Sequence, residues 1–164
     1  MAVTRILKIH NNPRKSPATT LKERIEYGLN PMKTDGTNLV SVYGCDKNTV
    51  ASEFALSQAQ YFSRTGRTPK NSVLAYQIRQ SFKPGEVTPE EANAIGYELA
   101  ERYLKGKFAF VVATHIDKAH IHNHIYFNAV SLDCCYKHRD RKRSAKDIAR
   151  LNDLICIEHQ LSTI

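Results

Sequence analysis

Four of the seven histidines lie within the ten positions from 115 to 124, and one aspartate lies among them. These residues are His115, Asp117, His120, His122 and His124. Neutral imidazole is the commonest protein ligand for metal ions, and several protonated imidazoles held together repel one another unless a cation organises them. A lone histidine in a strand is usually structural, but this density favours a metal centre or a catalytic site.

Two strands, residues 108–115 and 120–131, are predicted on either side of a short polar turn, because apolar runs flank the histidines. A strand places alternate side chains on one face, so His120, His122 and His124 would point the same way. Pairing as a hairpin would also bring the histidine that ends the first strand beside the last two of the second strand.

A cation held by three neutral histidines keeps open coordination positions and its full charge, which suits Lewis-acid work on an anionic substrate such as a phosphodiester. Scission also needs a nucleophile, either a metal-activated water or a side chain. Tyrosine would form a phosphate ester that preserves the energy of the broken bond, so that the cut can be resealed. The chain has eight tyrosines, and composition does not choose among them.

The charge balance favours a polyanionic partner. Lysine and arginine total 24 against 16 aspartate and glutamate, a formal net charge of +8, which points to nucleic acid more readily than to a small neutral substrate. The four cysteines show no Cys-x-x-Cys spacing and the N-terminus lacks a signal-peptide apolar core, so we expect a reduced, cytoplasmic protein. No apolar run approaches the ~20 residues that span a bilayer, so no membrane insertion is expected.

The remaining patterns predict one α+β domain over residues 1–164, with a central, largely antiparallel five-stranded sheet flanked by helices. Besides the histidine hairpin, we expect strands over 3–10, 38–45 and 72–82, and helices over 20–30, 48–65, 88–105 and from 144 onward. Thr20 with Glu23, and Thr88 with Glu91, have the form of capping boxes that open two of these helices. The first helix must end near Pro31, since the residue before proline avoids the helical region.

Three segments follow one another along the chain: RIEYGLNPMKT at 24–34, YQIRQSFKPGE at 76–86 and THIDKAHIHNHIYFN at 114–128. In this order they resemble the three motifs of the relaxase and mobilisation nuclease family, which are HUH-class endonucleases of plasmids and conjugative elements. The resemblance extends over most of the chain.

The resemblance implies strand-specific nicking of single-stranded DNA at a transfer origin, with accessory relaxosome proteins as partners. Tyr27 would attack the scissile phosphate, remain linked to the 5′ end and release a 3′ hydroxyl, and Ser81 would contact DNA near the nick. The phenol has an ordinary pKa of ~10, so it needs a base or a cation nearby. Asp117, His120 and the metal itself are the candidates. Should Tyr27 not be the nucleophile, the alternatives are Tyr43, Tyr61, Tyr76 and Tyr126.

Two histidine pairs compete for the family's pattern of two histidines around one bulky apolar residue. His120 and His122 enclose an isoleucine. In the other pair, His122 and His124, the second histidine stands four residues before Asn128, as relatives often have it. We favour His115, His122 and His124 as ligands, with His120 beside the site and Asp117 orienting an imidazole. Family precedent favours magnesium or manganese, while the histidine donors by themselves favour zinc, cobalt or nickel.

Two features depart from the family's pattern. Gln77 stands where relatives often have histidine, so a supporting contact of the second motif is expected to differ. The chain ends at Ile164, whereas relaxases usually continue into further domains, which predicts a trimmed nuclease domain or a short version of the protein.

Two basic segments are candidates for DNA contact. The residues of the first, beside the predicted nicking site, are Arg139, Arg141, Lys142 and Arg143, and those of the second, weaker one are Arg64, Arg67 and Lys70. Three other functions remain open: a replication initiator of the same class, a metal-dependent phosphodiesterase that uses activated water, and a non-catalytic basic DNA-binding domain.

Overall fold

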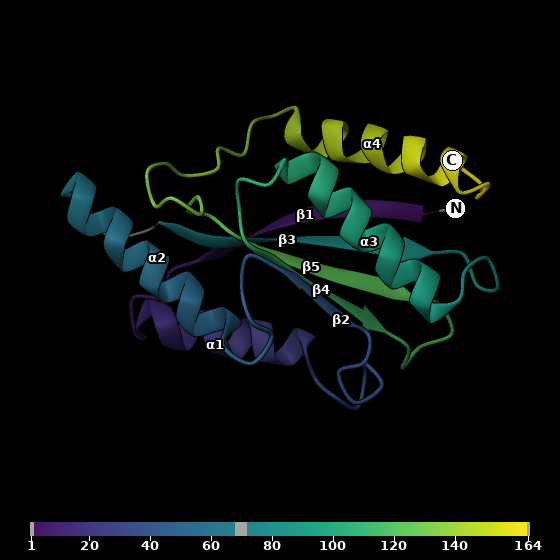
Figure 1. Cartoon of the computed structure of the whole chain (residues 1–164), viewed down its shortest axis with the longest axis horizontal. Coiled ribbons are helices and arrows are strands. Elements are labelled where there is room, and N and C mark those ends of the chain that lie inside the picture. Colours follow the sequence, from purple (N-terminus) through teal and green to yellow (C-terminus); the bar gives the residue numbers. More distant parts are fainter. Residues whose placement is uncertain (1, 68–71, 164) are drawn as a thin grey trace.

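A five-stranded sheet runs through the centre of the computed structural model, which describes residues 2–67 and 72–163 (Figure 1). Its strands are β1 (Ala2–His10), β2 (Val40–Tyr43), β3 (Val73–Phe82), β4 (Phe110–His115) and β5 (His122–Asn128). The order across the sheet is β1-β3-β5-β4-β2, and every neighbouring pair is antiparallel. The predicted α+β class and antiparallel sheet are therefore confirmed.

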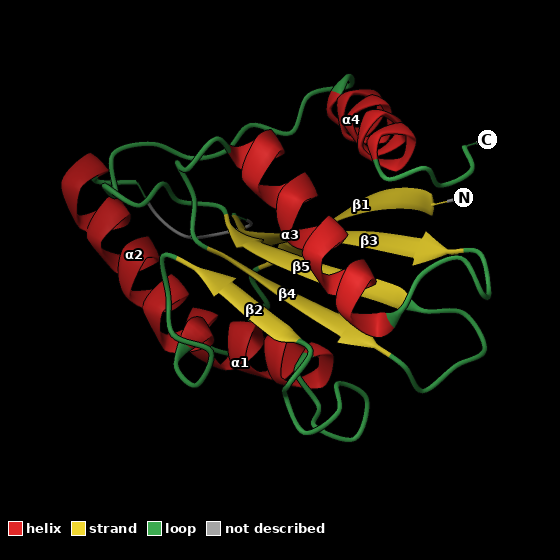
Figure 2. Ribbon diagram, turned by 45° about the vertical axis from the view of Figure 1, so that its right-hand side comes forward, coloured by secondary structure: helices red, strands yellow, loops and turns green. Residues whose placement is uncertain are grey.

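Helices cover both faces of this sheet (Figure 2). They are α1 (Pro17–Gly28), α2 (Val50–Thr65), α3 (Pro89–Leu104) and α4 (Ser144–Glu158). One apolar core lies between the sheet and α3 with α4, and a second lies between the opposite face and α1 with α2. Among the described residues, no helix has the length and apolar character needed to cross a membrane.

The helix starts agree with the sequence prediction at α3 and differ at α1. Thr88 and Glu91 form the expected capping box, each side chain accepting from the other residue's backbone N–H, at 3.2 and 2.9 Å. The capping box predicted at Thr20 is wrong, because α1 already begins at Pro17. Ser16 caps it by accepting from the Thr19 N–H at 3.1 Å, and proline suits the first helical position since its missing N–H is not needed there.

The histidine hairpin is confirmed, but its second strand is shorter than predicted. β4 ends at His115, which pairs with His122, so β4 offers no backbone partner to the residues before His122. His120 therefore lies in the connecting turn and not on the strand, and the expectation that it shares the strand alternation is wrong.

Asn123 explains why the two strand histidines face the same way. Its side chain is fully buried on the opposite face, where it donates to Gln80 Oε1 at 2.8 Å and to the Ala92 carbonyl at 2.7 Å. It also accepts from the Thr114 hydroxyl at 2.6 Å. A slip of one residue would leave these buried polar groups unpaired, so the network holds the strand register with the neighbouring histidines on the other face.

Candidate metal centre and tyrosine pocket

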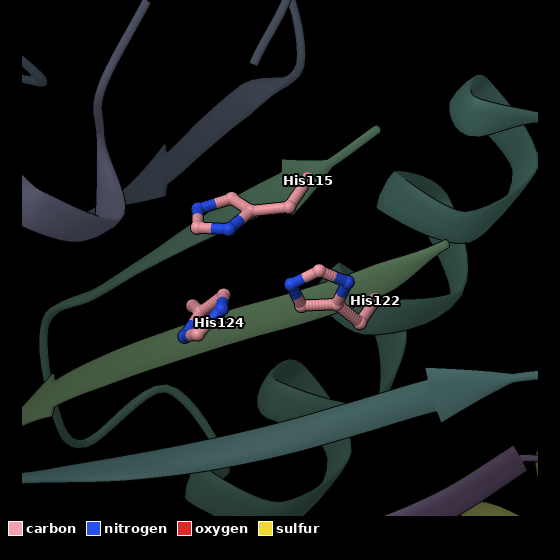
Figure 3. A group of neighbouring side chains, drawn as sticks. All are labelled: His115, His122 and His124. Atoms are coloured by element: carbon pink, nitrogen blue, oxygen red, sulfur yellow. The ribbon is translucent and has the colours of Figure 1, made fainter. Parts of the chain in front are cut away.

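Three histidines from β4 and β5 gather on the sheet face that α1 and α2 cover. One ligand atom from each of His115, His122 and His124 lies within 4.8 Å of the others. Figure 3 shows the three rings close together above the two strands. Three imidazoles at this spacing have the donor chemistry and the convergence that a divalent transition-metal ion needs.

Each imidazole also has a hydrogen-bonding partner on its other side. His115 Nε2 lies 2.6 Å from the Gly28 carbonyl, and His122 Nδ1 lies 3.3 Å from the His120 carbonyl. His124 Nδ1 lies 2.5 Å from the Gln77 amide, so Gln77 supplies a supporting contact. The Gln77 atom at this distance is the amide nitrogen Nε2. Rotating the amide by half a turn would put its oxygen at Nδ1–H and leave Nε2 of His124 to bind a metal, in the arrangement that second partners usually give to ligating histidines.

Burial favours the neutral form of all three rings. It is the largest cause that lowers the pKa of His115 and His122, and it lowers the pKa of His124 to about 3, where the neighbouring histidines add to the effect. Because a metal binds only the neutral imidazole, these rings stay ready to bind it below neutral pH.

The metal-free protein is expected to lose stability as the pH falls. His124 has an ordinary pKa of about 6.5 in the unfolded chain and about 3 in the folded one, so between these values only the unfolded chain gains a proton. The free energy of unfolding should therefore be unaffected by this group above pH ~6.5 and decrease progressively below it. Urea denaturation with a chelator present measures the slope. His124→Gln should flatten it, and equal slopes for both proteins would contradict the expectation.

These histidines form the floor of a pocket of about 300 Å³. The residues that line it are Tyr27, Lys33, Arg79, Ser81, His115, Asp117, Lys118, His120, His122 and His124. Tyr27 lies in the last turn of α1 with 62% of its surface exposed, and its hydroxyl is 3.2 Å from Lys33 Nζ. Residues from four elements and two loops thus meet around one solvent-accessible space.

Gly28 brings the end of α1 against the histidines. A Cβ at this position would collide with the Tyr126 ring, so only glycine allows the helix to approach β5 this closely. Its carbonyl oxygen, freed at the helix end, accepts from His115. The residue after Tyr27 therefore couples the tyrosine directly to the candidate metal ligands.

The comparisons with known proteins agree on one family. The model of the relaxase family, described as MobA/VirD2-like, nuclease domain, matches residues 27–161. The chain belongs to this family. Protein rlx of Staphylococcus aureus is 41% identical to this relaxase-family domain over 118 residues, which cover 72% of this chain and 35% of that protein.

A second relative is the group II intron-interrupted relaxase LtrB of Lactococcus lactis subsp. cremoris. It is 36% identical over 126 residues, which cover 65% of this chain and 22% of LtrB. The match with these curated relatives thus spans about a third of their length or less.

Besides Lys118 in the turn between β4 and β5, the relaxase domain has two pocket cations that sequence reasoning did not select, Lys33 and Arg79. Both lie inside the motif segments, Lys33 six residues after Tyr27 and Arg79 two residues before Ser81. Strand alternation puts Arg79 on the face of Ser81, so periodicity could have identified it. The position of Lys33 depends on the loop that follows α1. This loop is held against the end of β4, because the Lys33 carbonyl accepts from the Ile116 N–H at 2.9 Å.

Three other predicted residues line the same pocket. Ser81 pairs with His122 across β3 and β5, and Asp117 and His120 are exposed in the turn between β4 and β5. Within the described part of the chain, no hydrogen bond joins Asp117 to an imidazole, and the orienting contacts come from Gly28, His120 and Gln77.

The alternative tyrosines are held away from the pocket opening. The hydroxyls of Tyr43 and Tyr76 donate to the carbonyls of Gly106 and His138, at 3.5 and 3.3 Å. Tyr61 is buried and accepts from Arg67. Tyr126 shares the histidine face as predicted, but only 2% of its surface is exposed. None of these four lines the histidine pocket.

Both basic segments lie toward the other end of the sheet. Arg139, Arg141, Lys142 and Arg143 follow the far end of β5, about 20 Å along the strand from His122 at ~3.3 Å per residue. The expectation that this run lies beside the histidines is therefore wrong. Arg64 donates to the Asp133 carbonyl at 3.0 Å, which puts the end of α2 in the same region, together with Arg67. Lys70 lies outside the described residues.

Proposed function

We propose that this domain nicks single-stranded DNA at a transfer origin by forming a covalent ester between Tyr27 and the 5′ phosphate. We also propose a divalent metal ion bound by His115, His122 and His124, and accessory proteins that bring the origin to the enzyme. The observation that carries the proposal is the shared pocket: an exposed phenol, three convergent imidazoles and several cations line one space. Membership of the relaxase family supports it.

The reaction is a transesterification at phosphorus. Tyr27 Oη forms the new bond to phosphorus while the bond from phosphorus to the 3′ oxygen breaks, and that oxygen keeps the electron pair and takes up a proton. Asp117 and His120 are the side chains proposed to receive the phenol proton, and Ser81 is proposed to bind the DNA near the nick. A bound divalent cation would supply Lewis-acid polarisation of the phosphate oxygens.

The donor set bears on which metal is bound. Neutral imidazoles match zinc, cobalt or nickel by ligand chemistry, while magnesium and manganese prefer oxygen ligands. We propose magnesium or manganese as the ion in use, with the DNA phosphate and water supplying oxygen ligands in the open positions. Zinc, cobalt or nickel would then bind the free protein more tightly without necessarily giving a faster enzyme.

Lys33→Met is expected to slow adduct formation by about a hundred-fold. The Lys33 ammonium lies 3.2 Å from Tyr27 Oη, where it stabilises negative charge on the attacking oxygen. Lys33→Arg keeps the charge and should recover part of the rate. Single-turnover kinetics at saturating DNA measure the chemical step apart from binding. Lys146→Met, on an exposed position of α4, is the matched control, and equal rates for both methionine variants would refute a role for Lys33.

The function is tested with single-stranded origin DNA labelled at its 3′ end, the purified protein and manganese. A covalent adduct that survives denaturation supports the tyrosine mechanism. Cleavage without an adduct would instead assign the pocket to a phosphodiesterase with metal-activated water. Binding without cleavage under any divalent ion would leave a DNA-binding domain.

A further inference from the structure

Two arginines stand side by side next to the histidine pocket. Arg79 on β3 pairs directly with Arg5 on β1 on one side and with His124 on β5 on the other. Directly opposite residues of antiparallel strands project from the same face, so these side chains share the face of the metal ligands. The arginine pair, Arg5 and Arg79, therefore extends the histidine site toward the edge strand β1.

The face around the arginine pair is open. The core under α1 and α2 includes Ile9, Leu74 and Ala75, which lie toward the other end of β1 and β3. Arg5 and Arg79 are both exposed, and Arg79 also lines the histidine pocket. The surface is thus continuous from the pocket to the sheet edge.

No carboxylate neutralises this pair within the described chain, where neither arginine takes part in a salt bridge or a side-chain hydrogen bond. On the same strand β1, Lys8 forms an ion pair with Asp140 at 3.4 Å. Like charges directly opposite one another destabilise a sheet, so two adjacent unpaired guanidinium groups carry a cost to the free protein. Binding an anion between them would remove that cost.

We propose that Arg5 and Arg79 bind the phosphates next to the scissile one and guide the DNA strand from the histidine pocket across β3 to the edge at β1. This inference rests on the proposed function, since it takes single-stranded DNA as the occupant. Strands in a sheet are about 4.8 Å apart, so β1 lies about 10 Å from β5 and the arginines reach phosphates near the site. Arginine is well suited to this because its planar guanidinium binds phosphate through two hydrogen bonds.

A DNA strand bound by the arginine pair would follow a different path from one bound by the two basic segments. Arg139 and Arg141 lie beyond the far end of β5, separated from the pocket by the length of that strand. Arg79 lies within the pocket lining itself. The arginine pair is therefore nearer to phosphates adjacent to the nick than the far basic region is.

The test is binding of a fluorescent oligothymidylate in the presence of a chelator, over a range of salt concentrations. Arg5→Ala and Arg79→Ala should each weaken binding by about fivefold or more near 0.1 M salt and reduce the salt slope by about 0.7. Arg150→Ala removes the same charge from an exposed position on α4, across the sheet, and should leave both quantities unchanged. Unchanged salt slopes in both pair variants would overturn the proposal.

Stability separates a binding role from a structural one. Removing either arginine relieves repulsion, so the melting temperature of the free protein should stay the same or rise. A lower melting temperature in both variants would mean that the pair supports the fold, which also overturns the proposal. Failure of the proposed function is distinguishable, because it would appear as DNA binding by the unmodified protein without a covalent adduct.

Discussion

Replacing Tyr27 by phenylalanine is expected to abolish the covalent adduct and to lower the rate of strand cleavage by at least about a thousand-fold. The substitution removes one oxygen atom from a side chain that is 62% exposed, so no buried contact is lost. Lys33 Nζ lies over the Tyr27 ring, 4.2 Å from its centroid, and phenylalanine keeps a ring at this position. Denaturing electrophoresis with 3′-labelled DNA measures the adduct, and thermal melting should show no loss of stability.

Tyr126→Phe is the matched control for this experiment. Tyr126 belongs to the same sheet face and packs against Gly28, but its side chain is buried and does not line the pocket. It should keep the adduct. An adduct that persists in Tyr27→Phe and disappears in Tyr126→Phe would reassign the nucleophile.

Replacing His124 by alanine is expected to weaken metal binding by more than about a hundred-fold. Removing only a hydrogen-bond partner of a metal-binding side chain lowers metal affinity by roughly 10–100-fold. This substitution removes the metal-binding side chain itself. Its ring is also the most strongly held in the neutral form, with a pKa of about 3. Isothermal titration with manganese and with cobalt measures the affinity, and His115→Ala and His122→Ala should behave in the same way.

His120→Ala provides the contrast. The His120 ring is exposed in the turn and its nitrogens are not among the three converging ligand atoms, so its loss should leave metal affinity close to that of the unmodified protein. Gln77→Leu should have an intermediate effect of about tenfold, since it removes the contact to His124 Nδ1. If His120→Ala abolishes binding while His124→Ala retains it, the metal ligands include the first histidine pair instead.

Local patterns predicted most of the fold. The apolar runs around the histidines predicted the hairpin, and Thr88 with Glu91 predicted the start of α3, because strand alternation and helix capping depend on residues close together in sequence. The start of α1 was predicted too late. The structure instead has Ser16 as the cap, with proline at the first helical position.

The sequence by itself determined which residues could do this chemistry: the histidines of one hairpin, Tyr27 at a helix end and the order of the motifs. Only the tertiary structure decided which of them meet. Gly28 and His115 are 87 positions apart, and their contact depends on the docking of α1 against Tyr126. The arginine pair and the distant basic loop were likewise decided by strand register and by the end of β5 from which the chain leaves. These are long-range pairings, fixed by burial and by backbone hydrogen bonds between distant segments, which local sequence patterns do not encode.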